Sequence, residues 1–201
     1  MRVYDRPLEA SRRPWQRRIE VFSPKLGRRL TLFSYAAHDA WLLLEADPKV
    51  KRFCERPAPF EGEARRTLDF WVDYGRRAVF WVLGGDVAER EVLPKRMHEL
   101  PLEVLKREDL LALATRISNW SVIVPYLVAA RRFVYPRLEH DLHARLAKPH
   151  RLTSLERAFA PVEPSTVRAA LFALLARGKL AAPDLDRMPL GPQTFFRRAR
   201  R

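Results

Sequence analysis

Residues 65–86, RRTLDFWVDYGRRAVFWVLGGD, constrain the fold more than any other part of the chain. Aromatic and β-branched residues, which favour strands, lie on both sides of Gly75. A glycine between two such runs favours a tight turn, because it adopts backbone angles that other residues avoid. The stretch therefore predicts a β-hairpin. One acidic residue, Asp69, begins its first strand, whereas the second strand carries Trp81 and Leu83.

The composition bounds the class of protein. The chain has 201 residues, of which 47% are hydrophobic and 31% charged, as in an ordinary globular protein. Its longest apolar runs reach about half of the ~20 residues that a membrane span requires, so we expect no membrane association. The first residues show no secretory signal pattern. The single cysteine, Cys54, excludes an internal disulfide and a multi-cysteine metal site. These features predict a cytoplasmic protein.

The charge balance points to a polyanionic partner. The chain has 38 Lys and Arg residues against 24 Asp and Glu, a net charge of +14. Arginine supplies most of the excess, and its guanidinium pairs with phosphate in a forked geometry. An evenly spread charge that serves solubility is the alternative. The predicted DNA contacts are Arg12, Arg13, Trp15, Arg17, Arg18, Lys25, Arg28, Arg29, Lys179, Arg197 and Arg198.

The first part of the chain predicts a mixed α/β domain over residues 1–148. Two strands are expected within 16–34, a helix over 36–46, an extended segment at 50–57, and then the hairpin. Apolar spacing predicts a further helix over 101–118. The apolar run at 120–124 is typical of a buried central strand, and 126–146 reads as helical with an interruption at Pro136. The resulting order is αβββαβ, a mixed sheet flanked by helices.

The pattern changes after residue 148 and predicts a small second domain over 149–201. We expect a short helix over 153–159 that opens with a Thr or Ser cap. A second helix is expected to be capped at Ser165 and to end at Gly178. The ending Leu-x-x-x-Gly-x-Leu, residues 174–180, is typical of a winged helix, where it closes the recognition helix and starts the wing. The expected core positions are Val167, Leu171, Leu174 and Leu175.

The residues from about 20 to 85 resemble the TnsA-type transposon endonucleases, and the tail fits them more loosely. That family has a Lys-x-Gly-Arg turn, a strand, a helix opened by Ser-x-x-Glu, then Asp-Pro-x-Val and an extended Glu-Gln-Pro, in which Arg56 here replaces Gln. The matching residues are Lys25, Gly27, Arg28, Ser34, Asp47, Pro48, Val50, Phe53, Glu55 and Pro57. The resemblance implies a restriction-endonuclease-like domain of the PD-(D/E)XK type, followed by a winged-helix-like domain.

The resemblance also implies where a nuclease site would lie. In the family, a helix glutamate, a strand aspartate and a carboxylate on the next strand hold divalent metal beside the phosphate, and a lysine assists the attacking water. The corresponding positions here are Ala37, Asp69, Trp81 and Leu83. Only Asp69 is retained, so the site is interpreted as vacated. Asp73, on the same face of its strand, is the best candidate for a migrated ligand.

We therefore expect a nuclease-inactive subunit of a transposition machinery. The resemblance implies binding to transposon-end DNA, a DDE-type transposase and an AAA+ ATPase regulator, with no cofactor. Two alternatives stay open. One is an active endonuclease that uses Mg²⁺ through displaced ligands, and the other is a free-standing winged-helix DNA-binding regulator. The helical pair His140 and His143 is interpreted as a solvated surface rather than as part of a zinc site.

Overall fold

A computed structural model describes residues 3–9, 17–84, 93–131 and 135–199. The chain divides into two compact units. The first comprises Met1–Leu44 and Lys49–Ala112, and the second comprises Glu45–Pro48 and Leu113–Arg201. The boundary predicted between residues 148 and 149 therefore falls inside the second unit, because helices that precede it pack with the C-terminal helices.

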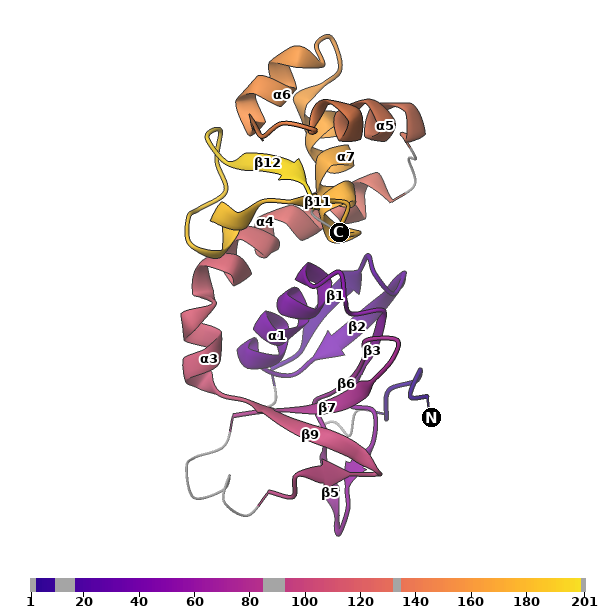
Figure 1. The fold of residues 1–201 in the computed structure, drawn as a ribbon. Helices are drawn as coiled ribbons and strands as arrows, with labels where there is room; N and C mark the ends of the chain where they lie inside the picture. Colours follow the sequence, from indigo (N-terminus) through magenta and orange to yellow (C-terminus); the bar gives the residue numbers. More distant parts are fainter. Residues whose placement is uncertain (1–2, 10–16, 85–92, 132–134, 200–201) are drawn as a thin grey trace. The chain divides into compact units, whose positions relative to one another are not determined.

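The first unit combines a five-stranded sheet with short hairpins and helices (Figure 1). Its elements are β1 (Ile19–Ser23), β2 (Arg28–Leu32), α1 (Tyr35–Ala46), β3 (Arg52–Glu55), β4 (Pro59–Phe60), β5 (Glu63–Thr67), β6 (Phe70–Asp73), β7 (Ala78–Leu83), β8 (Arg96–Met97), β9 (Leu100–Leu105) and α3 (Arg107–Ala112). The β1–β2 hairpin lies beside α1, and Lys25 Nζ donates to the carbonyl of Leu44 at 2.5 Å.

The main sheet of this unit is mixed, as expected. Its strand order is β3-β6-β7-β9-β8. Neighbours pair antiparallel except β7 and β9, which run parallel with Phe80 opposite Leu102. The hairpin predicted around Gly75 is confirmed as β6 and β7. Gly75 has φ +87°, and its N–H donates to Asp73 Oδ1 at 2.7 Å, so the turn needs a residue that tolerates positive φ.

One face of the sheet carries the core of the first unit. Trp71, Phe80 and Leu68 are almost completely buried there. Tyr4 joins them, with its ring 5.2 Å from that of Phe80 in an edge-to-face arrangement. Alternate residues of each strand reach this core, since side chains along a strand point to opposite faces.

The helix predicted over 101–118 is wrong in its first part, which forms strand β9. The alternation LPLEVL explains the difference, because Leu100 and Leu102 pack against the core and Glu103 points to the other face. Helical structure begins only at Arg107. The parallel partner of β7 is thus Leu100–Leu105 and not the apolar run at 120–124.

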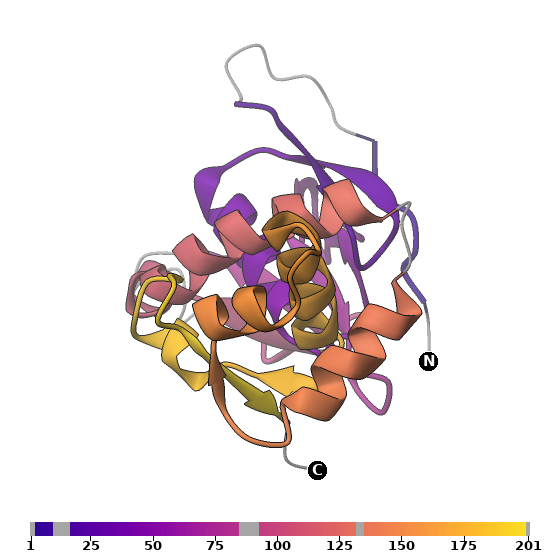
Figure 2. The same cartoon turned by 90° about the horizontal axis from the view of Figure 1, so that it is seen from above.

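The second unit is built around α7, which lies among α4, α5 and α6 (Figures 1 and 2). A small three-stranded sheet, ordered β10-β12-β11, completes it. Its elements are α4 (Ala114–Ala130), α5 (Pro136–Arg145), β10 (His150–Arg151), α6 (Leu152–Ala158), α7 (Pro164–Ala176), β11 (Leu180–Ala181), the 3-10 helix η1 (Pro183–Asp186) and β12 (Phe195–Arg198).

The strand predicted at 120–124 is wrong, because these residues lie in the middle of α4. Ile117, Trp120, Ile123 and Val124 are buried, which is the spacing of one helical face. A short, wholly apolar run does not by itself separate a buried strand from a buried helix. The helical prediction for 126–146 holds on both sides of its break, since α4 ends at Ala130 and α5 begins at Pro136.

The helix starts of the C-terminal part differ from the predicted caps. The N-cap residues of α6 and α7 are Arg151 and Glu163, and neither side chain makes a capping hydrogen bond. In α7, Pro164 occupies the first turn, where a missing N–H costs nothing. The end of α7 is as predicted, because Gly178 has φ +68° and the N–H of Lys179 donates to Leu174 O at 2.9 Å.

Helix α7 is a core helix. The four positions predicted to be buried are buried, together with Ala169, Ala170 and Phe172. A recognition helix needs a free face that enters the major groove. Helix α7 has no such face along its described length, since its fully exposed residues are Pro164 and Ser165 at its start. The structure therefore gives no support to DNA reading by this helix.

Among the helices that the structure describes, none is both long and apolar enough to cross a membrane.

Candidate functional site

The hairpin brings three of the four predicted nuclease positions together. Asp69 directly precedes β6, and its N–H donates to Trp81 O at 3.2 Å. Its side-chain Oδ2 accepts a hydrogen bond of 2.8 Å from the N–H of Leu83. Asp69, Trp81 and Leu83 thus meet at the end of the hairpin that lies away from Gly75.

Asp69 lies in surroundings that disfavour its charged form. Burial raises the pKa of its carboxyl from 3.8 to about 6, while the Leu83 N–H and the positive charge of Arg66 act in the opposite direction. A shifted carboxyl pKa is common in catalytic sites, but local hydrogen bonding also holds such residues in place for structural reasons. Here burial accounts for the raised pKa, and the bond to Leu83 gives the carboxylate a structural role in the hairpin.

Trp81 is paired with a carboxylate that the sequence analysis did not assign to the site. Its indole Nε1 donates to Glu103 Oε2 at 3.1 Å, and Trp81 faces Glu103 in the parallel register of β7 and β9. Arg77 Nη1 lies 3.8 Å from Glu103 Oε1. Glu103 was missed because its segment was predicted as a helix. The period-two alternation of Leu100–Leu105 is the signal that would have placed it on a strand.

Ala37 lies in the first turn of α1 and is buried. Its N–H donates to Ser34 Oγ at 3.0 Å, so Ser34 acts as the N-cap of the helix. The hydrogen bonds that join Asp69 to the hairpin do not extend to Ala37. The helix position of the predicted site therefore contributes a methyl group and no polar atom.

Asp73 does not join Asp69, which corrects the expectation that it is the best migrated ligand. Four residues of extended strand separate the two by about 13 Å. Arg52 Nη2 lies 2.8 Å from Asp73 Oδ2, and the other oxygen accepts from Gly75 in the turn. In the described part of the chain, no three His, Cys, Asp or Glu residues lie close enough to hold a metal ion.

The segment that carries the family-like Glu-x-Pro motif is held by a buried ion pair. Glu55 is only 3% exposed, and Arg28 contacts it through two nitrogens at 2.9 and 2.6 Å. The hydrogen bond to Glu55 raises the pKa of Arg28. Burial raises the pKa of the adjacent Cys54 thiol to about 12, so this cysteine is a packed and unreactive group.

The predicted DNA contacts of the first unit are used in different ways. Arg12, Arg13 and Trp15 lie outside the described residues. Arg17 contacts the hydroxyl of Tyr35 and stacks 4.5 Å over its ring, and Arg18 pairs with Glu20 at 2.5 Å. Lys25 and Arg28 make the intramolecular contacts given above. Arg29 is exposed on β2, where it lies opposite Phe22 of β1.

The predicted contacts of the second unit lie on or beside its small sheet. Lys179 is exposed just before β11, while Arg197 and Arg198 lie on β12. Arg198 Nε donates to the carbonyl of His143 at 2.7 Å, at the end of α5. Cations at a helix C-terminus interact favourably with its exposed carbonyls, so Arg198 also has a structural role.

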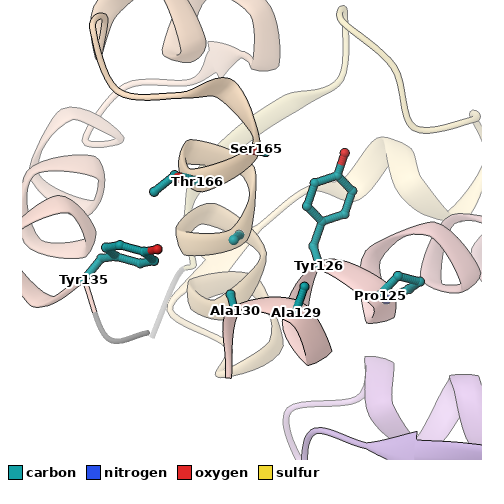
Figure 3. A pocket seen from close by; sticks show the side chains of 8 residues that line it. Pro125, Tyr126, Ala129, Ala130, Tyr135, Ser165 and Thr166 are labelled. Atoms are coloured by element: carbon teal, nitrogen blue, oxygen red, sulfur yellow. The ribbon is translucent and has the colours of Figure 1, made fainter. Parts of the chain in front are cut away.

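A groove of about 370 Å³ lies between the second half of α4 and the start of α7 (Figure 3). Tyr126 and Tyr135 form two of its walls, and the Tyr126 hydroxyl receives a hydrogen bond of 3.2 Å from Arg168. The residues that line it are Pro125, Tyr126, Ala129, Ala130, Tyr135, Ser165, Thr166 and Ala169. These lining residues carry no charge, so the groove differs in chemistry from the surface around Lys179, Arg197 and Arg198 in the same unit.

Neither the models of known protein families nor the curated proteins give a match to this chain.

Proposed function

We propose that this chain is a DNA-binding, TnsA-like subunit of a transposition machinery whose nuclease site has lost its chemistry. In this role it would bind transposon-end DNA and bridge a DDE-type transposase to an AAA+ ATPase regulator. The proposal includes a restriction-endonuclease-like fold for the first unit and a winged-helix-like fold for the second. The mixed sheet, with its parallel pair β7 and β9, is compatible with the first of these folds.

The observation that carries the proposal is how Asp69 is bonded at the end of the β6–β7 hairpin that lies away from Gly75. The Asp69 carboxylate is bonded to the backbone of Leu83, and the Asp69 N–H donates to the carbonyl of Trp81, a residue with an indole where the family has a carboxylate. Mg²⁺ dehydrates reluctantly and requires several oxygen ligands in octahedral order. A single carboxylate that is already hydrogen-bonded supports binding and bridging better than metal-dependent hydrolysis.

The net charge of +14 supports the DNA-binding part. A protein that neutralises several phosphates releases counterions, so its affinity falls steeply with salt. The test is fluorescence anisotropy with a labelled duplex that carries a transposon end, against a scrambled duplex of equal length. We expect tighter binding to the end sequence and a loss of affinity of at least ~100-fold between about 50 and 200 mM salt. Undetectable binding at the lower salt would overturn the proposal.

Glu103 favours a second candidate, an active endonuclease with a displaced ligand. It lies beside Trp81, one strand away from the position that the family uses, and its side chain is 42% exposed. If Asp69 and Glu103 shared a metal ion, cleavage would require both carboxylates. A Glu103→Gln variant separates the two candidates, because only the endonuclease would lose an activity.

A further inference from the structure

The C-terminal end of α5 gathers positive charge from three elements. His140 and His143 lie one helical turn apart on α5, so their side chains share a face. Lys179 lies in the turn between α7 and β11, and Arg198 ends β12. These four residues are called the α5 cationic surface below.

Backbone and side-chain hydrogen bonds bring three of these residues, His143, Lys179 and Arg198, close to one another. The N–H of Ala199 donates to Lys179 O at 3.1 Å, which joins Lys179 to the end of β12. Arg198 Nε donates to His143 O at 2.7 Å, and the N–H of Arg198 donates to Leu146 O at 3.1 Å. Hydrogen bonds of the backbone therefore hold the surface together, while the side chains of Lys179, Arg198 and His140 are exposed.

The charges that act on His143 are all positive. Burial, followed by Arg198, Lys179 and His140, lowers the pKa of His143. Helix α5 also carries two carboxylates, Glu139 and Asp141, of which Asp141 is exposed to solvent. Glu139 is instead paired with Arg177 at 2.5 Å. A histidine whose neighbours include Arg198, Lys179 and His140 favours an external anion.

We propose that the α5 cationic surface binds the phosphate groups of duplex DNA, and that His143 makes this binding tighter as the pH falls. The inference rests on the proposed DNA-binding function and names a contact point and a regulation for it. Duplex DNA carries one negative charge per ~1.7 Å of its axis. Several cations that lie close together on a protein surface can therefore each contact a different phosphate. Because Arg198 is committed to carbonyls, Lys179 and the two histidines supply the free donors.

The pH dependence follows from linkage. Without DNA, the neighbouring cations oppose protonation of His143, whose pKa is lowered. A bound phosphate offsets those cations and raises this pKa, so binding takes up a proton and strengthens as the pH falls. Each unit by which DNA raises the pKa strengthens binding about tenfold across the titration.

The experiment measures the affinity of the full chain for a labelled duplex by anisotropy, across salt and from about pH 8 to about pH 5.5. Lys179→Gln should reduce the slope of log affinity against log salt by about one. His143→Gln should remove most of the strengthening at low pH. Arg157→Gln, an exposed change on α6, is the matched control and should leave both quantities unchanged.

Other titrating groups are separated by variants. Asp69 in the first unit has a pKa of about 6, so Asp69→Asn tests whether it causes the pH effect, which we expect it to leave in place. If His143→Gln does not fold, as judged by circular dichroism, His140→Gln serves instead, because that side chain is exposed. We expect it to reduce the strengthening at low pH.

The outcomes distinguish the two proposals. If the natural chain binds DNA but the Lys179 and histidine variants keep its salt slope and pH dependence, the surface assignment is overturned and the DNA-binding function stands. If the natural chain does not bind DNA, both proposals fail. Equal affinity for heparin or for anionic vesicles at matched charge would overturn the assignment of DNA as the partner.

Discussion

Asp69 Oδ2 accepts a hydrogen bond of 2.8 Å from the backbone N–H of Leu83, across the two strands of the hairpin. The bond joins Asp69 to Leu83, the residue at the position where the proposed resemblance implies a catalytic lysine. It gives the Asp69 carboxylate a structural partner within its own hairpin. A change in the charge or identity of Asp69 should therefore alter the stability of the fold, even if the protein catalyses no reaction.

The first prediction concerns the pH dependence of stability. The pKa of Asp69 is about 6 in the folded chain and near 3.8 when unfolded, so the folded state binds the proton more tightly. The stability that this group contributes is fully present below about pH 3.8 and is lost as the pH rises through about 6. Asp69→Asn keeps an oxygen acceptor for Leu83 and removes the charge that these surroundings disfavour. We expect it to raise the free energy of unfolding at pH 8 by about 2 kcal/mol.

Urea denaturation of the natural chain and of Asp69→Asn, at about pH 5 and pH 8, measures this difference. Asp184→Asn, a change at an exposed carboxylate, is the control and should shift neither value by more than about 0.5 kcal/mol. A natural chain and an Asn variant that show the same pH dependence would rule out Asp69 as the titrating group.

The second prediction concerns the contact between Trp81 and Glu103. Trp81→Phe removes the indole N–H and shortens the ring system, and Glu103→Gln removes the charge while it keeps the size of the side chain. Because the hydrogen bond involves a charged but partly exposed acceptor, we expect a coupling energy of about 1 kcal/mol in a double-mutant cycle. Purely additive effects on the free energy of unfolding would show that the contact contributes nothing.

The third prediction separates two neighbouring arginines. Arg28→Met leaves the buried Glu55 carboxylate without its partner and should lower the free energy of unfolding by about 3 kcal/mol. Arg29→Met changes an exposed residue and should leave stability nearly unchanged, while weakening DNA binding and its salt dependence. Thermal or urea unfolding together with anisotropy gives both values. Equal losses of stability would contradict the structural role of Arg28 as the partner of the buried Glu55.

The local patterns that predicted the structure correctly are those with a strong turn or periodic signal. The Gly75 hairpin, the strands before α1 and the stop at Gly178 depend on the backbone freedom of glycine and on short-range alternation. The core of α7 followed from its helical spacing. The sequence predicted these features correctly because residues close together in the chain determine them.

The errors arose where a short apolar segment fits two structures. Residues 120–124 fit a strand, but the burial of Ile117 and Trp120 extends their pattern into α4. Residues 100–105 fit a helix by their local sequence, but in the fold they pair in parallel with β7 and form a strand. The contact between Trp81 and Glu103 depends on that pairing and register, which the sequence between the strands does not encode locally. This part of the candidate site therefore became visible only in three dimensions.

The measurement that tests the central proposal most directly is cleavage of transposon-end DNA by the purified chain with Mg²⁺ or Mn²⁺, alone and beside the proposed transposase partner. The natural chain, Asp69→Ala and Glu103→Gln are compared on the same labelled duplex, with binding recorded in parallel. We predict that all three bind the duplex and that none cuts it, because one hydrogen-bonded carboxylate does not replace the water shell of the metal. Metal-dependent cleavage by the natural chain that is lost in Asp69→Ala would contradict the account.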